Sequence, residues 1–220
     1  MVFENYCQNE ICFVLLLLTL HLIMNKLFYY NELSTWYFIH FIGNFYIVIF
    51  CLYPIFIIFK DPIQHLFNPT PYYDTMVLVD ILHLYHLLLF KCTKDDIFHH
   101  LFFVGFGTLT VYIFNNGYYT ALTHFFICGL PGGIDYFYLF LYQNKYITKE
   151  ERLKYAMFLN VWIRSPGLCM LATFALINFI YSQKTFFNIV EFTLQLILTI
   201  GNGQMYMRDV VYAAGKKNVY

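Results

Sequence analysis

The chain consists almost entirely of apolar stretches of near-membrane length, and this pattern restricts its folds more than any other feature. A helix needs roughly 20 mainly apolar residues to cross the hydrocarbon core of a bilayer. Only 12% of the 220 residues are charged, whereas a soluble domain carries about a quarter, so too little polar sequence remains to cover a soluble core. We predict an all-α, polytopic membrane protein with about seven transmembrane helices, at about 11–30, 36–59, 73–90, 97–114, 118–142, 155–180 and 186–207.

The Lys and Arg residues divide unequally between the two sides that this topology defines. Ten of the 13 follow the first, third, fifth and seventh spans, two (Lys60 and Lys184) lie on the opposite side, and Arg164 lies within a span. Because basic residues stay on the cytoplasmic side during insertion, we expect a lumenal N-terminus and a cytosolic C-terminus. The ten residues are Lys26, Lys91, Lys94, Lys145, Lys149, Arg152, Lys154, Arg208, Lys216 and Lys217.

The remaining composition argues against several other classes of protein. A net charge of zero gives no sign of nucleic-acid binding. Six dispersed cysteines without a CxxC pair favour neither a disulfide framework nor a zinc finger. The first span lacks a basic leading region and a small-residue cleavage site, so we expect it to be a retained anchor. We divide the chain into this N-terminal anchor (1–35), one transmembrane domain (36–210) and a short cytosolic tail (211–220).

Proline and glycine residues interrupt two of the predicted spans. The fifth contains Gly129–Gly133, with a proline among them, and the sixth contains Ser165–Gly167. A broken helix in lipid is tolerated only where protein or a water-filled cavity satisfies the freed backbone groups. We therefore expect a bundle around a cytosol-facing cavity, with a simple kink as the alternative for the sixth span. Three prolines in 60–74 predict an extended or turned connection rather than another helix.

Ionisable and amide side chains from five predicted spans fall in the same half of the bilayer. At 1.5 Å per residue, His86 lies about 7.5 Å and His83 about 12 Å below the cytosolic boundary near Lys91. Because such groups are costly in hydrocarbon, their shared depth is a functional-site hypothesis. The set comprises His83, His86, His99, His100, Asp135, Arg164 and Asn202.

Helical spacing predicts carboxylate partners for two of these histidines. Asp96 precedes His99 and His100 by three and four residues, so its carboxylate can face both imidazoles and fix a tautomer. Asp80 and His83 are likewise three residues apart.

Depth predicts one ion pair, and the lack of charged neighbours predicts that three histidines lie outside the site. We expect Asp135 to pair with Arg164, because an unpaired arginine at that depth is expensive. A structural ion pair is the favoured interpretation and a functional pair the alternative. His21, His40 and His65 have no charged partner nearby in sequence, so we expect the first two to be packing residues and the third a loop residue.

Three kinds of chemistry suit such a cluster. A histidine can act as general base in transfer of an acyl group to an amine or alcohol. The cluster can also bind a metal, or form a proton-coupled or polar path through the membrane. Membrane di-iron oxygenases use many more histidines than one HxxH (His83 and His86) and one adjacent pair, so we assign no metal.

Five short motifs, taken in order, resemble the TLC domain, which is shared by ceramide synthases, the translocon-associated TRAM proteins and several lipid-associated relatives. The likeness covers nearly the whole chain after the first span. The matching segments are Asp96–His100, Asn115–Gly117, Gly132–Asp135, Asn160–Pro166 and Asn202–Tyr206.

This resemblance implies a helical membrane bundle around a lipid-accessible cavity, usually in the endoplasmic reticulum. In ceramide synthases a double histidine is required to transfer a fatty acyl group from acyl-CoA to a sphingoid base. His99 and His100 hold that position here, and Asp135 stands where the family has an acidic residue. Phe103 replaces the threonine of the synthases' HHxxT motif, and only the last acid of their HDxxD-like stretch is present. Family members without the full set are linked to lipid composition, sensing or transport, and this chain lies nearer to them.

Our first functional hypothesis is a TLC-domain protein that binds or handles a lipid or acyl chain, with no requirement for catalysis. The alternative is a ceramide-synthase-like N-acyltransferase, with His99 or His100 as general base, Asp96 orienting it and Arg164 contacting a phosphate or carboxylate. Acyl-CoA is then a substrate, and no cofactor is required. A third hypothesis is a transporter with an intramembrane His/Asp/Arg site.

All three hypotheses place the protein in the membrane, with the bilayer and a lipid or acyl ligand as partners and no role for nucleic acid. A homo-oligomer is compatible with the sequence. The candidate catalytic residues are His99, His100, Asp96 and Asp135, and the candidate substrate-binding residues are His83, His86, Arg164 and Asn202.

Overall fold

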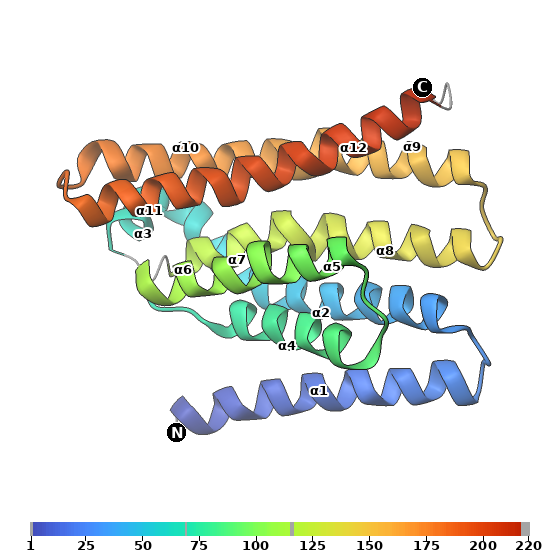
Figure 1. Cartoon of the computed structure of the whole chain (residues 1–220). Coiled ribbons are helices and arrows are strands. Elements are labelled where there is room, and N and C mark those ends of the chain that lie inside the picture. Colours follow the sequence, from blue (N-terminus) through green and yellow to red (C-terminus); the bar gives the residue numbers. More distant parts are fainter. Residues whose placement is uncertain (1, 69, 115–116, 217–220) are drawn as a thin grey trace.

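Helices account for all the regular structure in residues 2–68, 70–114 and 117–216, which are the residues that the computed structural model describes. The chain folds back and forth through helical segments that run roughly along one axis (Figure 1). In order they are α1 (Val2–Lys26), α2 (Glu32–Lys60), α3 (Pro62–Phe67), α4 (Asp74–Leu89), α5 (Lys94–His99), η1 (His100–Gly105), α6 (Phe106–Phe114), α7 (Tyr118–His124), η2 (Phe125–Gly129), α8 (Leu130–Gln143), α9 (Lys149–Leu159), η3 (Asn160–Arg164), α10 (Ser165–Tyr181), α11 (Phe186–Leu196), η4 (Ile197–Gly201) and α12 (Asn202–Lys216).

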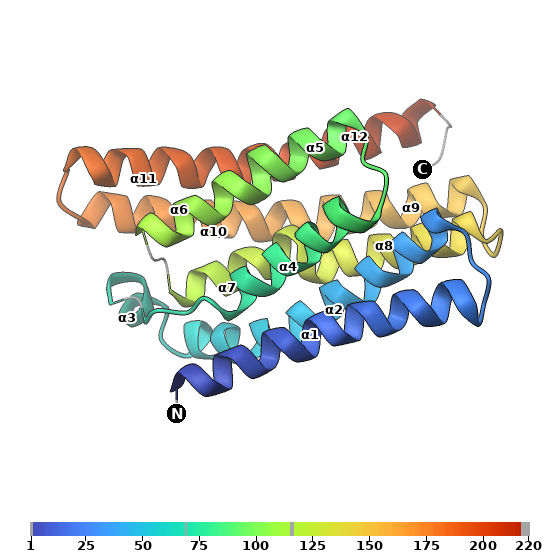
Figure 2. The same cartoon turned by 60° about the horizontal axis from the view of Figure 1, so that its bottom comes forward.

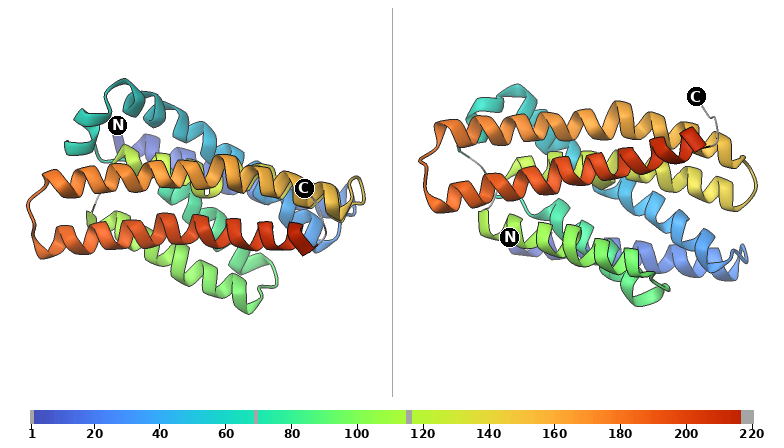
Figure 3. Two further views of the ribbon diagram at one scale, coloured as in Figure 1. Left: turned by 90° about the horizontal axis from the view of Figure 1, so that it is seen from above. Right: turned by 45° about the horizontal axis from the view of Figure 1, so that its top comes forward.

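These segments form a bundle with α2 on the inside. α2 packs against α1, α4, α7 and α8, while α12 packs against α9 and α11 against α10. α1 forms one edge of the bundle and α9 to α12 form the opposite edge (Figures 1 and 2). The segment from α5 to α6 lies between α4 and the α11–α12 segment, as the views in Figure 3 also show.

The connections separate into two groups at opposite ends of the bundle. Those after α1, α4 and α8, and the C-terminal end of α12, lie toward the right in Figure 1. The N-terminal end of α1, α3 and the α10–α11 turn lie toward the left. We call the first the basic end, because it carries Lys26, Lys91, Lys145, Lys149 and Lys216. Lys217, Asn115 and Asn116, which the sequence analysis used, lie outside the described residues.

Five helices in the described part of the chain are long and apolar enough to cross a membrane. Large apolar side chains cover the outside of the bundle, among them Leu22, Phe56, Leu88 and Trp162. Exposed apolar surface on this scale is what lipid requires and water disfavours. The protein is therefore a helical integral membrane protein. The qualifying helices are Gln8–Lys26, Glu32–Lys60, Asp96–Phe114, Tyr118–Gln143 and Lys149–Tyr181.

Side-chain caps fix where several helices begin. Thr93 and Asp96 form a reciprocal capping box at α5, in which Thr93 Oγ1 accepts from the Asp96 N–H (3.2 Å) and Asp96 Oδ2 accepts from the Thr93 N–H (2.8 Å). Each box satisfies two of the backbone donors that a helix start leaves open. Thr148 and Glu151 form the same arrangement at α9.

The connection 60–74 contains the short helix α3, so the prediction of an extended or turned path without another helix was wrong there. Pro62 occupies the first turn of α3, where its missing N–H removes no intrahelical bond. Asp61 Oδ1 accepts from the Gln64 N–H at 3.0 Å and completes the start. His65, expected in a loop, lies in this helix.

The two interruptions predicted from proline and glycine are not breaks. Helix runs without a gap from Tyr118 to Gln143 and from Lys149 to Tyr181. A π-helical turn precedes each proline instead: η2 ends two residues before Pro131 and η3 ends two residues before Pro166. A wider i→i+5 turn rearranges the carbonyls that a proline would otherwise clash with or leave unpaired.

Small residues bring neighbouring segments close together at two contacts. A Cβ added to Gly133 of α8 would lie 2.9 Å from the ring of Phe45 in α2. A Cβ added to Gly167 of α10 would collide with the ring of Phe126 in η2. Membrane helices associate largely through such close packing, so these glycines set how near α8 and α10 come to their neighbours.

Candidate functional site

Five histidine rings from three helical segments meet near the basic end. His40 comes from α2, His83 and His86 from α4, His99 from the end of α5 and His100 from the start of η1. Ring centroids are 5.2 Å apart for His40–His86, 4.7 Å for His86–His100, 5.1 Å for His83–His100 and 6.0 Å for His83–His99. The four histidines predicted as site residues are therefore together, and His40, which we had assigned to packing, belongs with them.

Backbone carbonyls orient three of these rings in the same way. The Nδ1 atoms of His40, His83 and His100 lie 3.1, 2.7 and 2.5 Å from the carbonyl oxygen four residues earlier. A carbonyl only accepts, so each Nδ1 carries the hydrogen and donates it. Each Nε2 is then left as a lone-pair acceptor.

Three Nε2 atoms of the cluster are buried without a partner. The Nε2 atoms of His40, His86 and His100 make no hydrogen bond, and these residues are 2%, 2% and 6% exposed. His86 also packs against the indole of Trp36, with centroids 4.2 Å apart. Among the residues that the structure describes, no three His, Cys, Asp or Glu side chains are arranged to hold a metal ion.

The predicted carboxylate partners bind elsewhere. The Asp96 carboxylate is held in the capping box with Thr93, and His100 contacts only its backbone carbonyl. Asp80 Oδ1 accepts from the Thr108 hydroxyl at 2.6 Å, while His83 Nδ1 donates to a backbone carbonyl. Spacing alone identified both pairs, but a helix start in one case and a neighbouring helix in the other supplied nearer partners.

The predicted ion pair between Asp135 and Arg164 was also wrong. Asp135 pairs with Arg152 of α9, whose Nη2 lies 3.0 and 3.3 Å from the two carboxylate oxygens. Arg164, only 6% exposed, donates from Nη1 to Asn160 Oδ1 at 2.7 Å. Its guanidinium carbon also lies 4.9 Å from the centre of the Tyr206 ring. We had counted Arg152 as a loop cation, yet it lies one turn into α9 and reaches α8.

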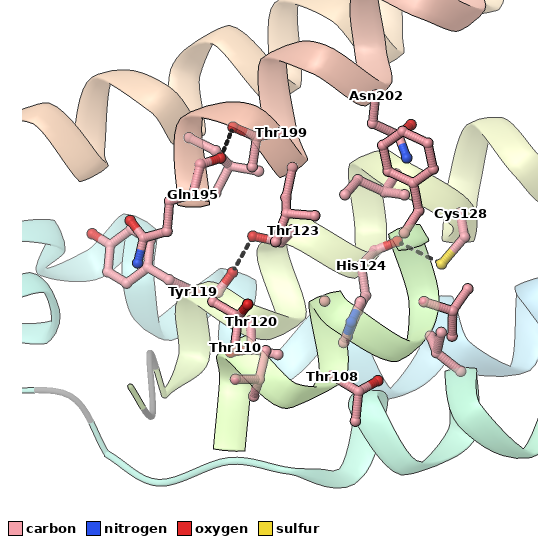
Figure 4. A pocket seen from close by; sticks show the side chains of 18 of the residues that line it. Thr108, Thr110, Tyr119, Thr120, Thr123, His124, Cys128, Gln195, Thr199 and Asn202 are labelled. Carbon is pink, nitrogen blue, oxygen red and sulfur yellow. Dashed lines mark hydrogen bonds between the residues drawn. The ribbon is translucent and has the colours of Figure 1, made fainter. Parts of the chain in front are cut away.

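A pocket of about 530 Å³ lies inside the bundle, next to the histidine cluster. α2 to α8 and α10 to α12 contribute to its wall, and so do all four π turns. Figure 4 shows part of it, with side chains of α6, α7, η2 and the α11–α12 segment pointing into a common space. Those labelled are Thr108, Thr110, Tyr119, Thr120, Thr123, His124, Cys128, Gln195, Thr199 and Asn202.

The two ends of this pocket differ in chemistry. Toward the basic end its wall carries His83, His99, Asp135, Arg164 and Asn202, all of them predicted site residues. Toward the opposite end, near α3, the wall includes Leu66, Phe67, Phe114, Leu171 and Phe174, together with the polar side chains of Asn178, Glu191 and Gln195 on α10 and α11. The pocket therefore has a basic-end wall rich in ionisable groups and an opposite wall that is mainly apolar but holds these three polar side chains.

The hydroxyls midway along the pocket are mostly satisfied within their own helices. Thr110, Thr123 and Thr199 each donate to the carbonyl four residues earlier, at 2.8, 2.8 and 2.6 Å. A threonine bonded in this way has used its donor and keeps its oxygen as an acceptor. The hydroxyl of Thr120, in the same wall, is buried without a partner.

His86 and His100 form a layer behind the pocket, because neither lines it. Sequence reasoning missed the lining residues His40, Asn44, His124, Tyr136 and Tyr206. Depth was a usable signal for His40, which lies eight residues into α2 from the basic end. Tyr206 closes the Asn202–Tyr206 motif, which was a usable signal, whereas for Tyr136 the sequence held none, because 21 tyrosines occur in the chain.

The fold and the pocket together define an all-helical integral membrane protein with an amphipathic internal site. No family model matches the chain, and neither the curated proteins nor the solved structures contain a detectable relative.

Proposed function

We propose that this protein binds one lipid or acyl chain inside the bundle, with the chain along the apolar part of the pocket and the head near the histidine cluster. The amphipathic pocket is the observation that carries this proposal. Its volume of about 530 Å³ falls within the range of about 300–1,000 Å³ that small-molecule sites occupy. The apolar outer surface places the bundle where such ligands are concentrated.

We further propose that the chain crosses the membrane seven times, with the basic end in the cytosol. α4 has 16 residues, which make about 24 Å of helix. α11, η4 and α12 form one continuous helical segment, which packs against α10. Both segments lie alongside the five qualifying helices (Figure 2). The bias of Lys and Arg toward one end supports a lumenal N-terminus, and the pocket would then receive its polar ligand groups from the cytosolic side.

Membership of the TLC domain family, with residence in the endoplasmic reticulum, remains our proposal on the five sequence motifs. Residues from four of those motifs line the pocket: His99, Asp135, Arg164 and Asn202. The motifs are far apart in sequence, so their convergence on one pocket supports a shared role.

A second candidate function, transfer of an acyl group from acyl-CoA to an amine, is favoured by the orientation of His83. This ring lines the pocket, donates from Nδ1 to Val79 and keeps Nε2 available as a base. His99 also lines the pocket and has Nδ1 3.3 Å from the Tyr206 hydroxyl. The capping role of Asp96 removes it as the orienting carboxylate in this mechanism.

The lipid proposal is tested by identifying what co-purifies with the chain. We expect mass spectrometry of gently solubilised protein to find a single-chain lipid near one equivalent, and Thr123→Trp, which fills the pocket, to remove it. Thr173→Trp is the matched control, because Thr173 also donates to the carbonyl four residues earlier but lies on the exposed face of α10. Equal lipid in both folded variants would contradict the proposal.

The acyltransferase candidate needs a separate assay. Membranes with the protein should convert labelled acyl-CoA and a long-chain amine, and His83→Ala or His99→Ala should abolish the product. His21→Ala is the control, because His21 bonds Tyr85 at the α1–α4 contact and does not line the pocket. Undiminished product in both pocket variants would exclude these histidines as bases.

A further inference from the structure

Arg164 is a buried cation whose hydrogen bonds are only partly satisfied. Nη1 donates to Asn160, the guanidinium lies over Tyr206, and Nε is buried without a partner. Within the described residues, Nη2 also makes no hydrogen bond. The Nε–Nη2 edge of a guanidinium is the side that grips an oxyanion with two parallel bonds.

The carboxylates around the pocket do not neutralise this charge. Two acids line the pocket, Asp135 and Glu191. Asp135 is paired with Arg152, and Glu191 accepts from Gln195 Nε2 at 3.0 Å. Glu191 also lies 11 residues before Asn202 on the same helical segment, about 16 Å along it. Among the described residues, no carboxylate lies within 4 Å of Arg164.

Two amides that line the same pocket as Arg164 are also incompletely bonded. Asn44 and Asn202 line the pocket, each is 2% exposed, and the Oδ1 atom of each is buried without a partner. An uncompensated guanidinium in a membrane-buried wall is costly, and an anion that enters the pocket would compensate it. The two amide oxygens are acceptors, so it is the guanidinium and not these oxygens that favours an anionic ligand.

We propose that Arg164 binds the anionic headgroup, a carboxylate or a phosphate, of a single-chain lipid. This inference rests on the proposed lipid-binding function and names the class of ligand for the same pocket. The headgroup lies against the Nε–Nη2 edge of Arg164, and the chain extends toward Phe114 and Phe174. The pocket volume suits one chain, so two-chain phospholipids are poor ligands.

The test compares three single-chain probes of equal length, a carboxylic acid, an alkyl phosphate and a primary alcohol, as competitors of a neutral fluorescent alkyl reporter. The purified full chain is used in uncharged detergent. We expect the acid or the phosphate to bind at least about tenfold more tightly than the alcohol, and the tighter anion identifies the headgroup. Arg164→Met should reduce the affinity for that anion to the level of the alcohol and leave the alcohol unchanged.

Lys154→Met is the matched control, because Lys154 is an exposed cation on the preceding turns of the same helix. It should retain the preference for the anion. Equal binding of all three probes by the wild-type chain would overturn the inference while leaving lipid binding intact. Binding of none of them would remove the proposed function itself. Because the wild-type comparison needs no variant, a misfolded Arg164→Met would not obscure the result, and Arg164→Lys provides a milder substitution.

Discussion

The ion pair between Asp135 and Arg152 gives the sharpest test of how α8 and α9 are held together. Both side chains are about one-fifth exposed (21% for Asp135 and 19% for Arg152), so the pair lies between a surface bridge and a fully buried one. A surface pair contributes about 0–1 kcal/mol, whereas removal of one partner of a buried pair costs about 3–5 kcal/mol. We therefore expect Asp135→Asn to lower the free energy of unfolding by about 2 kcal/mol.

A double-mutant cycle isolates the pair itself. Asp135→Asn, Arg152→Gln and the double variant should show a coupling energy of about 1–2 kcal/mol, because hydrogen bonds to charged groups contribute about 1.5–3 kcal/mol and partial exposure reduces this. For a chain of this size, 1 kcal/mol corresponds to a shift in Tm of about 2–4 °C. Thermal unfolding of the detergent-solubilised chain, followed by the loss of monodisperse protein, measures the four species.

The same cycle with Arg164→Gln in place of Arg152→Gln serves as the control. The structure gives Asp135 and Arg164 different partners, so their effects should be nearly additive. Additive effects for Asp135 with Arg152, together with strong coupling to Arg164, would refute the described pairing and restore the one predicted from sequence.

Three further predictions concern packing, capping and topology. Gly167→Ala should destabilise the chain by about 1–3 kcal/mol through its clash with Phe126, whereas Gly107→Ala, with open space around it, should be neutral or slightly stabilising; thermal unfolding that does not distinguish them would contradict the α10–η2 contact. Thr93→Ala should cost about 0.5–2 kcal/mol by removing the cap of α5, and protection of its first amides in hydrogen exchange should fall; unchanged protection would refute the cap. In intact microsomes, with the six native cysteines replaced because Cys92 lies at the basic end, an impermeant maleimide should label Tyr146→Cys and not Gln183→Cys, and the reverse pattern would invert the proposed topology.

The class of fold was predictable because it follows from composition and length alone. Apolar stretches of about 20 residues have one stable arrangement in lipid, the hydrogen-bonded helix. The depth of His83, His86, His99 and His100 followed from the same regularity, since helical rise converts position in a span into distance. Their shared depth was therefore predictable, whereas their contact also required the helix rotations that only the structure shows.

What the sequence could not supply was the choice among competing partners. Asp96 had two imidazoles within helical reach, but the open N–H groups of a helix start were nearer. Asp135 had a predicted partner in the sixth span, but Arg152 reached it across the α8–α9 contact. Which partner each carboxylate finds depends on how far each helix is rotated about its own axis. That rotation is set by packing contacts, such as Gly133 against Phe45, and no pattern in a single sequence specifies them.

The four π turns make the internal site unusually sensitive to chain length. Each π turn accommodates one residue more than an α-helical turn would. As a result, every later side chain on the same continuous helix is rotated by about 100° about the helix axis. A one-residue deletion inside η3 would therefore leave α9 in place while swinging Ser165 and everything after it away from its present neighbours. A substitution would change one side chain of this site at a time. An insertion or deletion of one codon in a π turn would instead change which face of the following helix lines the pocket.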